Sequence, residues 1–326
     1  MKRALPLLLA LLLALAFGAM AGHDWASPGR LFSALSGDTS LQSQLLMVWR
    51  LPRVLAAALV GALLGLGGAI FQGVFRNPLA EPYLLGSSGG AAIGATIALL
   101  VPLGLPAGPA LAGLSFLGAW GATWLVLAVA GLHGRPDTAG LLLAGVAIAA
   151  MLGALRSFLM LALSDDTVNL QVVLSWTLGG IQTPDMAGLA LLSGLVVAAL
   201  ALSLRLARGL DLLGLGEEQA FAFGLDPAGF VRIAVLVGAG IVAAAVAYGG
   251  LVAFIGLIAP HLARWWTGPR HAGMLPASAL IGAAIVCACD GIARAVLPPA
   301  EVPLGLITAL FGGPFFLLLL ARRLRA

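Results

Sequence analysis

Long apolar runs are the feature that most limits what this chain can fold into. The runs 52–74, 186–206 and 275–296 each reach the roughly 20 residues that a membrane-spanning helix needs. Charged residues make up only 9% of the 326 residues, whereas soluble domains carry about 25%. No soluble core of this size could absorb so much apolar surface. The sequence therefore predicts an all-α polytopic membrane protein.

Ten transmembrane helices are predicted. Their boundaries are 4–21, 52–74, 84–102, 108–131, 138–162, 186–206, 229–248, 250–264, 275–296 and 302–320. The eighth is short and glycine-rich, so we expect it to be broken or tilted. Residues 1–326 are expected to form a single transmembrane domain, with outer segments at 22–50 and 163–185 and an inner loop at 207–228.

The N-terminus allows two interpretations. Lys2 and Arg3 precede the first apolar run, and "AMA" at 19–21 resembles a signal-peptide cleavage site. The alternative is a first spanning helix whose basic end stays in the cytoplasm. We favour the helix, because it makes the charge distribution consistent with both termini inside.

With both termini inside, the positive charges obey the rule that cytoplasmic segments are rich in lysine and arginine. Twelve of the 17 basic residues then lie in or next to inner segments: Lys2, Arg3, Arg76, Arg135, Arg205, Arg208, Arg232, Arg264, Arg270, Arg322, Arg323 and Arg325. This predicts a multi-pass membrane protein with both termini in the cytoplasm.

Three of the five exceptions lie at the outer face. Arg50 and Arg53 begin the second span, and Arg294 ends the ninth. They either anchor lipid headgroups or receive an acidic partner from outside. Asp290 and Arg294 are four residues apart, so they share a helix face and are expected to pair, which is compatible with a purely structural role.

The other two exceptions are Arg30, in the outer segment, and Arg156, inside the fifth span. An arginine in hydrocarbon costs about 2.5–3.5 kcal/mol on insertion scales, so it usually faces a cavity or a partner. Arg156 either extends outward to the membrane surface or lines a pathway for an anionic solute.

What the chain lacks constrains its energy source. Lys2 is its only lysine, so no phosphate-binding loop of the type G-x-x-x-x-G-K-[ST] exists, and "GSSGG" at 86–90 is interpreted as a tight turn into the third span. Acidic residues that could couple proton flow are nearly absent from the spans, which disfavours a self-sufficient secondary transporter without excluding it. No arrangement typical of catalysis, a metal site or nucleic-acid binding is present.

One polar stretch interrupts the apolar chain: "GLGEEQAFAFGLDP" at 214–227. Gly216 and Asp226-Pro227 are expected to bound a short amphipathic helix from Glu217 to Phe223. Interfacial helices favour Lys and Arg on their polar face, whereas this one carries two acids. The stretch is therefore predicted to dock a cytoplasmic protein that hydrolyses ATP, not a lipid surface.

Several motifs together resemble the FecCD-like permeases of type II ABC importers, which take up iron-siderophores, haem and vitamin B12. They occur in order along most of the chain: 50–95 with "RLPRVL" and "RNPLAEP", "VLSWTLGGI" at 173–181, "LGLGEEQAFAFGLDP" at 213–227, "GLVAFIGLIAPHLAR" at 250–264, and 289–316 with "CDGIARAVLPPAEVP".

The resemblance implies a homodimer with a central pathway, two ATPase subunits beneath it that bind ATP and magnesium, and a periplasmic binding protein above. This chain itself would be no enzyme and would bind no cofactor. The implied ATPase-coupling residues are Gly216, Glu217, Glu218, Gln219, Ala220, Phe221 and Gly224. The implied binding-protein contacts are Arg50, Arg53 and Arg294.

The resemblance also places Arg156 and Met160 along the pathway. It gives Asn77, Pro78, Pro260 and His261 a gating or structural role. Two halves of inverted topology are expected, and the similar stretches 60–68 and 237–250 fit this. The substrate favoured by Arg156 is an anionic iron complex, haem or a ferric siderophore, and the alternative is vitamin B12. A structural membrane anchor for a cytoplasmic complex is a further alternative.

Overall fold

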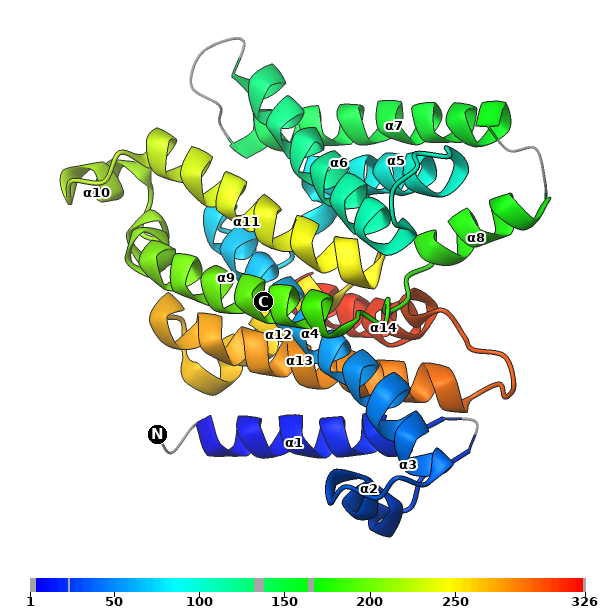
Figure 1. Cartoon of the computed structure of the whole chain (residues 1–326). Helices are drawn as coiled ribbons and strands as arrows, with labels where there is room; N and C mark the ends of the chain where they lie inside the picture. The colour runs from blue at the N-terminus through cyan, green and yellow to red at the C-terminus, as the bar shows by residue number, and fades with distance from the viewer. Residues whose placement is uncertain (1–3, 23, 132–137, 164–166, 325–326) are drawn as a thin grey trace.

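A computed structural model describes residues 4–22, 24–131, 138–163 and 167–324, which form helices joined by loops (Figure 1). Ten helices correspond to the predicted spans: α1 (Ala4–Met20), α4 (Leu51–Val74), α5 (Ser87–Leu100), α6 (Ala107–Ala130), α7 (Thr138–Leu163), α9 (Met186–Leu213), α11 (Pro227–Gly249), α12 (Ile255–Thr267), α13 (His271–Ala295) and α14 (Leu304–Leu324). Within the described ranges, seven helices are long and apolar enough to cross a membrane, and α1 and α5 are shorter apolar helices.

Smaller helices fill the segments between the predicted spans. The outer segment 22–50 holds α2 (Pro28–Leu35), α3 (Leu41–Leu45) and the π-helical turn η1 (Leu46–Arg50), which runs directly into α4. A 3₁₀ turn, η2 (Pro82–Leu85), precedes α5. The segment 163–185 contains α8 (Thr167–Thr177), and the inner loop contains α10 (Glu217–Ala222).

Several predicted boundaries were wrong. The ninth span starts four residues earlier, at His271, and the tenth continues four residues further, to Leu324. The third span starts later, since η2 turns the chain before α5 begins at Ser87. The sixth continues two turns further to Leu213, so only 214–226 of the predicted loop 207–228 lies between helices. The eighth starts at Ile255 and not at residue 250, because Gly250 and Phe254 adopt positive φ angles that an α-helix cannot contain.

The helix α4 forms the centre of the bundle, between α9, α11, α12 and α13. Its glycines permit close packing: a Cβ atom added at Gly61 or Gly65 would collide with the backbone carbonyls of Gly282 and Ser278 on α13. Small residues four apart on two facing helices let membrane helices approach closely. The packing that positions both ends of the bundle therefore depends on α4 having glycine at these places.

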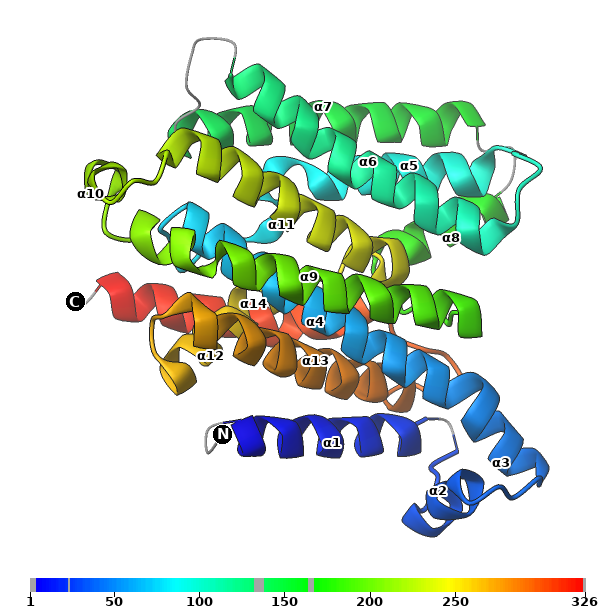
Figure 2. The same cartoon turned by 60° about the vertical axis from the view of Figure 1, so that its left-hand side comes forward.

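The connecting elements gather at two ends of the bundle. Figure 2 shows the start of α1, the helix α10 and the end of α14 at one end, and α2 and α3 at the other. The first end is the one predicted to be cytoplasmic. Two polar regions of interest lie at these opposite ends.

Candidate functional site

The first region is the loop 214–226, called here the coupling loop, which contains α10. Gly216 precedes α10 with a φ of 112°, and Gly224 follows it with a φ of 85°. The amide of Leu225 donates to the carbonyl of Ala220 and that of Gly224 to Phe221, which is the Schellman arrangement that ends a helix. The predicted helix is confirmed, but Gly224 ends it, whereas Asp226 caps the start of α11 by accepting from the Gly229 amide.

The coupling loop turns one face inward and the other outward. Ala220 is fully buried against the protein's own helices, so it holds α10 in place and offers no surface to a partner. Glu218 and Gln219 are exposed, and the aromatic rings of Phe221 and Phe223 are 69% and 68% exposed. Two acids and two aromatic rings thus project from the end of the bundle.

Two contacts that the sequence reasoning missed hold this end of the bundle together. Arg76, which follows α4, pairs with Glu217 at 3.0 Å, and both side chains are largely exposed. Asp211 near the end of α9 accepts from the backbone amide of His271 and contacts its Nδ1 at 2.6 Å. Both contacts join residues far apart in the sequence, so no local pattern could reveal them.

The motif "GLVAFIGLIAPHLAR" (250–264) meets the motif "RNPLAEP" (76–82) and its flanking residues near the start of α12. The Gln72 amide donates to the carbonyl of Leu257, and Arg264 donates to the Gln72 side-chain oxygen at 3.4 Å. The Tyr83 hydroxyl donates to the carbonyl of Val252. Burial raises the pKa of Glu81 to about 7, although the carboxylate accepts from the backbone amide of Phe254. The structure therefore ties the two predicted gating segments to each other.

The four residues assigned to gating or structure lie in this region. Asn77 accepts from the Leu79 amide at 3.1 Å and so forms a turn with Pro78. Pro260 lies inside α12. The His261 ring packs edge-on against Trp265, and both its nitrogens are buried without a hydrogen-bond partner among the described residues. These contacts are compatible with either a structural or a gating role.

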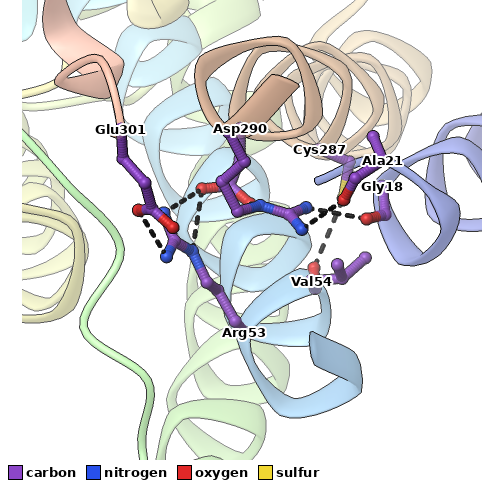
Figure 3. A network of polar contacts seen from close by, with 8 residues as sticks. Gly18, Ala21, Arg53, Val54, Cys287, Asp290 and Glu301 are labelled. Carbon is purple, nitrogen blue, oxygen red and sulfur yellow. Dashed lines mark hydrogen bonds and ion pairs between the residues drawn. The ribbon is translucent and has the colours of Figure 1, made fainter. Parts of the chain in front are cut away.

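The second region lies at the opposite end and is called here the Asp290 cluster, made of Arg53, Asp290, Arg294 and Glu301 (Figure 3). The Asp290 side chain is 1% exposed and accepts from Arg53 with one oxygen and from Arg294 with the other. Arg53 also contacts Glu301 at 2.8 Å. The predicted pairing of Asp290 with Arg294 is confirmed, and Glu301 is a partner that sequence spacing could not indicate.

The three arginines predicted to dock a binding protein are not equally available. Arg294 is 6% exposed, and its guanidinium donates to Asp290 and to the carbonyls of Gly18 and Ala21 at the end of α1. The Arg294 side chain is therefore buried and held by groups of the protein itself. Arg53 is partly exposed beside Glu301, and Arg50 donates to the backbone carbonyl of Asp24. Arg50 and Arg53 remain the arginines that an outside partner could reach.

The two predicted pathway residues lie on α7, at the same end of the bundle as the Asp290 cluster. The Arg156 guanidinium donates to the Thr177 hydroxyl on α8 at 2.6 Å, while its Nε is buried without a hydrogen bond among the described residues. Met160 is half-buried one turn further along. The arginine thus has one protein partner and retains unused donors.

Taken together, a bundle of apolar helices, a projecting α10 at one end and an arginine-rich opposite end define a membrane permease. The sequence model of the FecCD transport family matches residues 7–322. The chain therefore belongs to this family and is an ABC importer permease of the FecCD type, as the resemblance implied.

Individual relatives agree with this assignment. The chain is 39% identical over 294 residues to the hemin transport system permease protein of Yersinia pestis, covering 88% of this chain and 86% of the relative. It is 40% identical over 274 residues to the cobalamin import system permease protein of Halobacterium salinarum, covering 84% and 72%. A solved structure described as an inward-facing metal-chelate type ABC transporter superposes with a TM-score of 0.84, at 30% identity and 98% coverage of both chains.

Proposed function

We propose that this chain is the inner-membrane permease of an importer that moves a large iron complex, haem or a ferric siderophore, from the periplasm to the cytoplasm. The observation that carries the ATP-driven part of the proposal is the coupling loop, which projects two acids and two aromatic rings from the bundle. The similarity to a hemin transport permease supports the iron complex as substrate. A side chain such as Phe221, left 69% exposed beside charged neighbours, is typical of a surface that a partner protein covers.

Membership of the FecCD family supports the following partners. Two ATPase subunits, with ATP and magnesium, dock on the coupling loops of a homodimer, and a periplasmic binding protein docks at the opposite face near Arg50 and Arg53. Both termini are then cytoplasmic. ATP-driven movement of the ATPases passes through α10 to α9 and α11, and so changes which side the central pathway opens to. This chain forms no covalent bond with its substrate and needs no cofactor of its own.

The exposed apolar surface of α7 supports the proposed homodimer. Few of its residues are buried within the chain, although the helix is about as hydrophobic as the central helices. Its exposed side chains include Leu143, Val146, Phe158 and Leu161. We propose that a second copy covers this helix and that Arg156 and Met160 line the pathway between the copies.

The docking role is tested by the double substitution Glu217→Lys/Glu218→Lys in proteoliposomes that contain the ATPase. We expect ATP-dependent uptake to fall at least tenfold, while the amount of folded permease stays unchanged, because reversed charges on exposed side chains remove docking and not packing.

Arg76→Ala is the matched control, since it breaks the Arg76–Glu217 pair and leaves both acids in place. Normal uptake by the double variant would contradict the docking role. Equal loss in Arg76→Ala would assign the effect to the ion pair instead.

The substrate is addressed by Arg156→Ala. Haem and ferric siderophores are commonly anionic, so we expect their uptake to fall while cobalamin uptake changes little. Thr177→Val is the control, because it removes the hydrogen bond to Arg156 and keeps the guanidinium. Equal loss in both variants would mean that Arg156 acts by joining α7 to α8.

Vitamin B12 is the second candidate substrate, favoured by the similarity to a cobalamin import permease. Uptake of radiolabelled cobalamin, compared with haem under the same conditions, distinguishes the two. Co-purification of the tagged chain from its host, followed by mass spectrometry, tests for the ATPase. Its reproducible absence from a folded dimer would favour a self-sufficient transporter.

A further inference from the structure

An apolar groove runs along the bundle between α6, α9 and α11. It consists of two adjoining cavities of about 570 and 330 Å³, which share the lining residues Phe116, Leu195 and Ala244. None of the residues lining either cavity belongs to α7 or α14. The groove is thus separate from the proposed pathway.

The length of the groove matches one leaflet of a membrane. On α6 its lining extends from Gly108 to Trp120, a separation of 12 positions, or about 18 Å of helix. The hydrocarbon core of a bilayer is about 30 Å thick, so one leaflet is about 15 Å. The inner part is lined by apolar side chains and small residues, which suits an acyl chain.

The mouth of the groove is polar, and the charge that lines it is negative. Gln182, Thr183 and Asp185 line it together with Tyr248, at the start of α9 and therefore at the end opposite α10. Asp185 is exposed, and one carboxylate oxygen accepts from the Gly188 amide at 2.8 Å. Among the described residues the other oxygen has no partner, and no lysine or arginine lines either cavity.

We propose that this groove is a binding site for a phospholipid with a primary ammonium headgroup, of the phosphatidylethanolamine type. One acyl chain lies between α6, α9 and α11, and the ammonium group donates to the free oxygen of Asp185. Arg53 lines an adjoining cavity that shares Leu111 and Gln182 with the mouth, but it is paired there with Asp290 and Glu301. An anionic headgroup therefore meets an unpaired carboxylate and no unpaired cation, so a phosphatidylglycerol is the disfavoured occupant.

Native mass spectrometry of the delipidated chain tests this. The chain is offered equal amounts of phosphatidylethanolamine and phosphatidylglycerol with identical acyl chains. We expect the first to occupy the chain about two- to fivefold more often, the range for one charge pair near the surface. Asp185→Asn should abolish this preference, and because asparagine caps a helix as well as aspartate, α9 stays intact.

The acyl part of the site is tested by filling the groove. Gly113 lines it, and a side chain added there meets open space, so Gly113→Phe should displace the lipid without disturbing the packing. Gly121→Phe is the matched control, since Gly121 also lies on α6 with open space beside it but outside the groove. We expect lipid occupancy to fall several-fold in the first variant and to remain in the second.

Three results would overturn the proposal: equal occupancy by both lipids, an unchanged preference in Asp185→Asn, or the same occupancy in the two glycine variants. The inference goes beyond the proposed function. Native mass spectrometry measures lipid binding without any transport. A negative binding result would therefore leave the import proposal intact, and a negative transport result would leave the lipid site intact.

Discussion

The two ends of the bundle both join distant segments through ion pairs, but the pairs lie in different environments. In the Asp290 cluster the side chain of Asp290 is 1% exposed and pairs with two guanidinium groups. At the coupling loop the side chain of Glu217 is 59% exposed and pairs with a single guanidinium group, that of Arg76, which is itself 39% exposed.

This difference indicates what each end does. Removing either partner of a buried ion pair leaves the other partner charged, away from water and without a counter-charge. An exposed pair is replaced by water at little cost. We therefore expect the Asp290 cluster to matter most for stability, whereas α10 is held mainly by Ala220 and its backbone caps, and most of its other side chains are exposed.

The largest expected effect is that of Asp290→Ala. It leaves Arg294 buried without a counter-charge, so the free energy of unfolding should fall by about 3–5 kcal/mol. Detergent-induced unfolding followed by helical circular dichroism measures this.

Glu301→Gln is the matched control, since it removes the exposed partner of the same Arg53 and should cost no more than about 1 kcal/mol. Similar losses in the two variants would show that burial does not distinguish the two carboxylates.

An intermediate effect is expected for Gly224→Ala. A Cβ atom at this position meets open space, but the φ of 85° is unfavourable for alanine, so the helix end should lose about 1–2 kcal/mol. Hydrogen exchange of the Leu225 amide, which donates to Ala220, should then be faster.

Gly121→Ala provides the comparison, because it adds the same methyl group to an ordinary helical position and is expected to stabilise α6 slightly. If exchange at Leu225 were unchanged in Gly224→Ala, the Schellman arrangement would not be what holds the end of α10.

The smallest expected effect is the coupling energy of Arg76 with Glu217. A double-mutant cycle with alanine at both positions should give about 0.2–1 kcal/mol, and less in high salt, because both side chains are exposed. A coupling above about 2 kcal/mol would place this pair in the same class as the Asp290 cluster and remove the distinction between the two ends.

Most of the fold followed from local information. An apolar run of span length predicts its own helix, so all ten predicted spans correspond to helices, and the acids and glycines around Glu217 predicted α10. The pair Asp290–Arg294 followed from helical spacing alone.

What could not be predicted depends on tertiary contacts. The start of α12 at Ile255 follows from positive φ angles at Gly250 and Phe254, which no hydropathy pattern encodes. The links of Arg53 to Glu301 and of Arg294 to the end of α1 join residues more than 200 positions apart. These contacts change the interpretation of Arg294, because they turn a candidate surface residue into a buried one.

The bonds from Arg294 to Gly18 and Ala21 have a consequence for how the chain is assembled. The partner of the Ala21 carbonyl lies 273 residues later in the sequence, so at about 5–20 residues per second it is synthesised roughly 14 to 55 s after α1. Until then α1 resides in the bilayer without the helix against which it finally packs. A nascent chain that stops before α13 would leave the first helix without its main packing partner, and the bundle closes only late in translation.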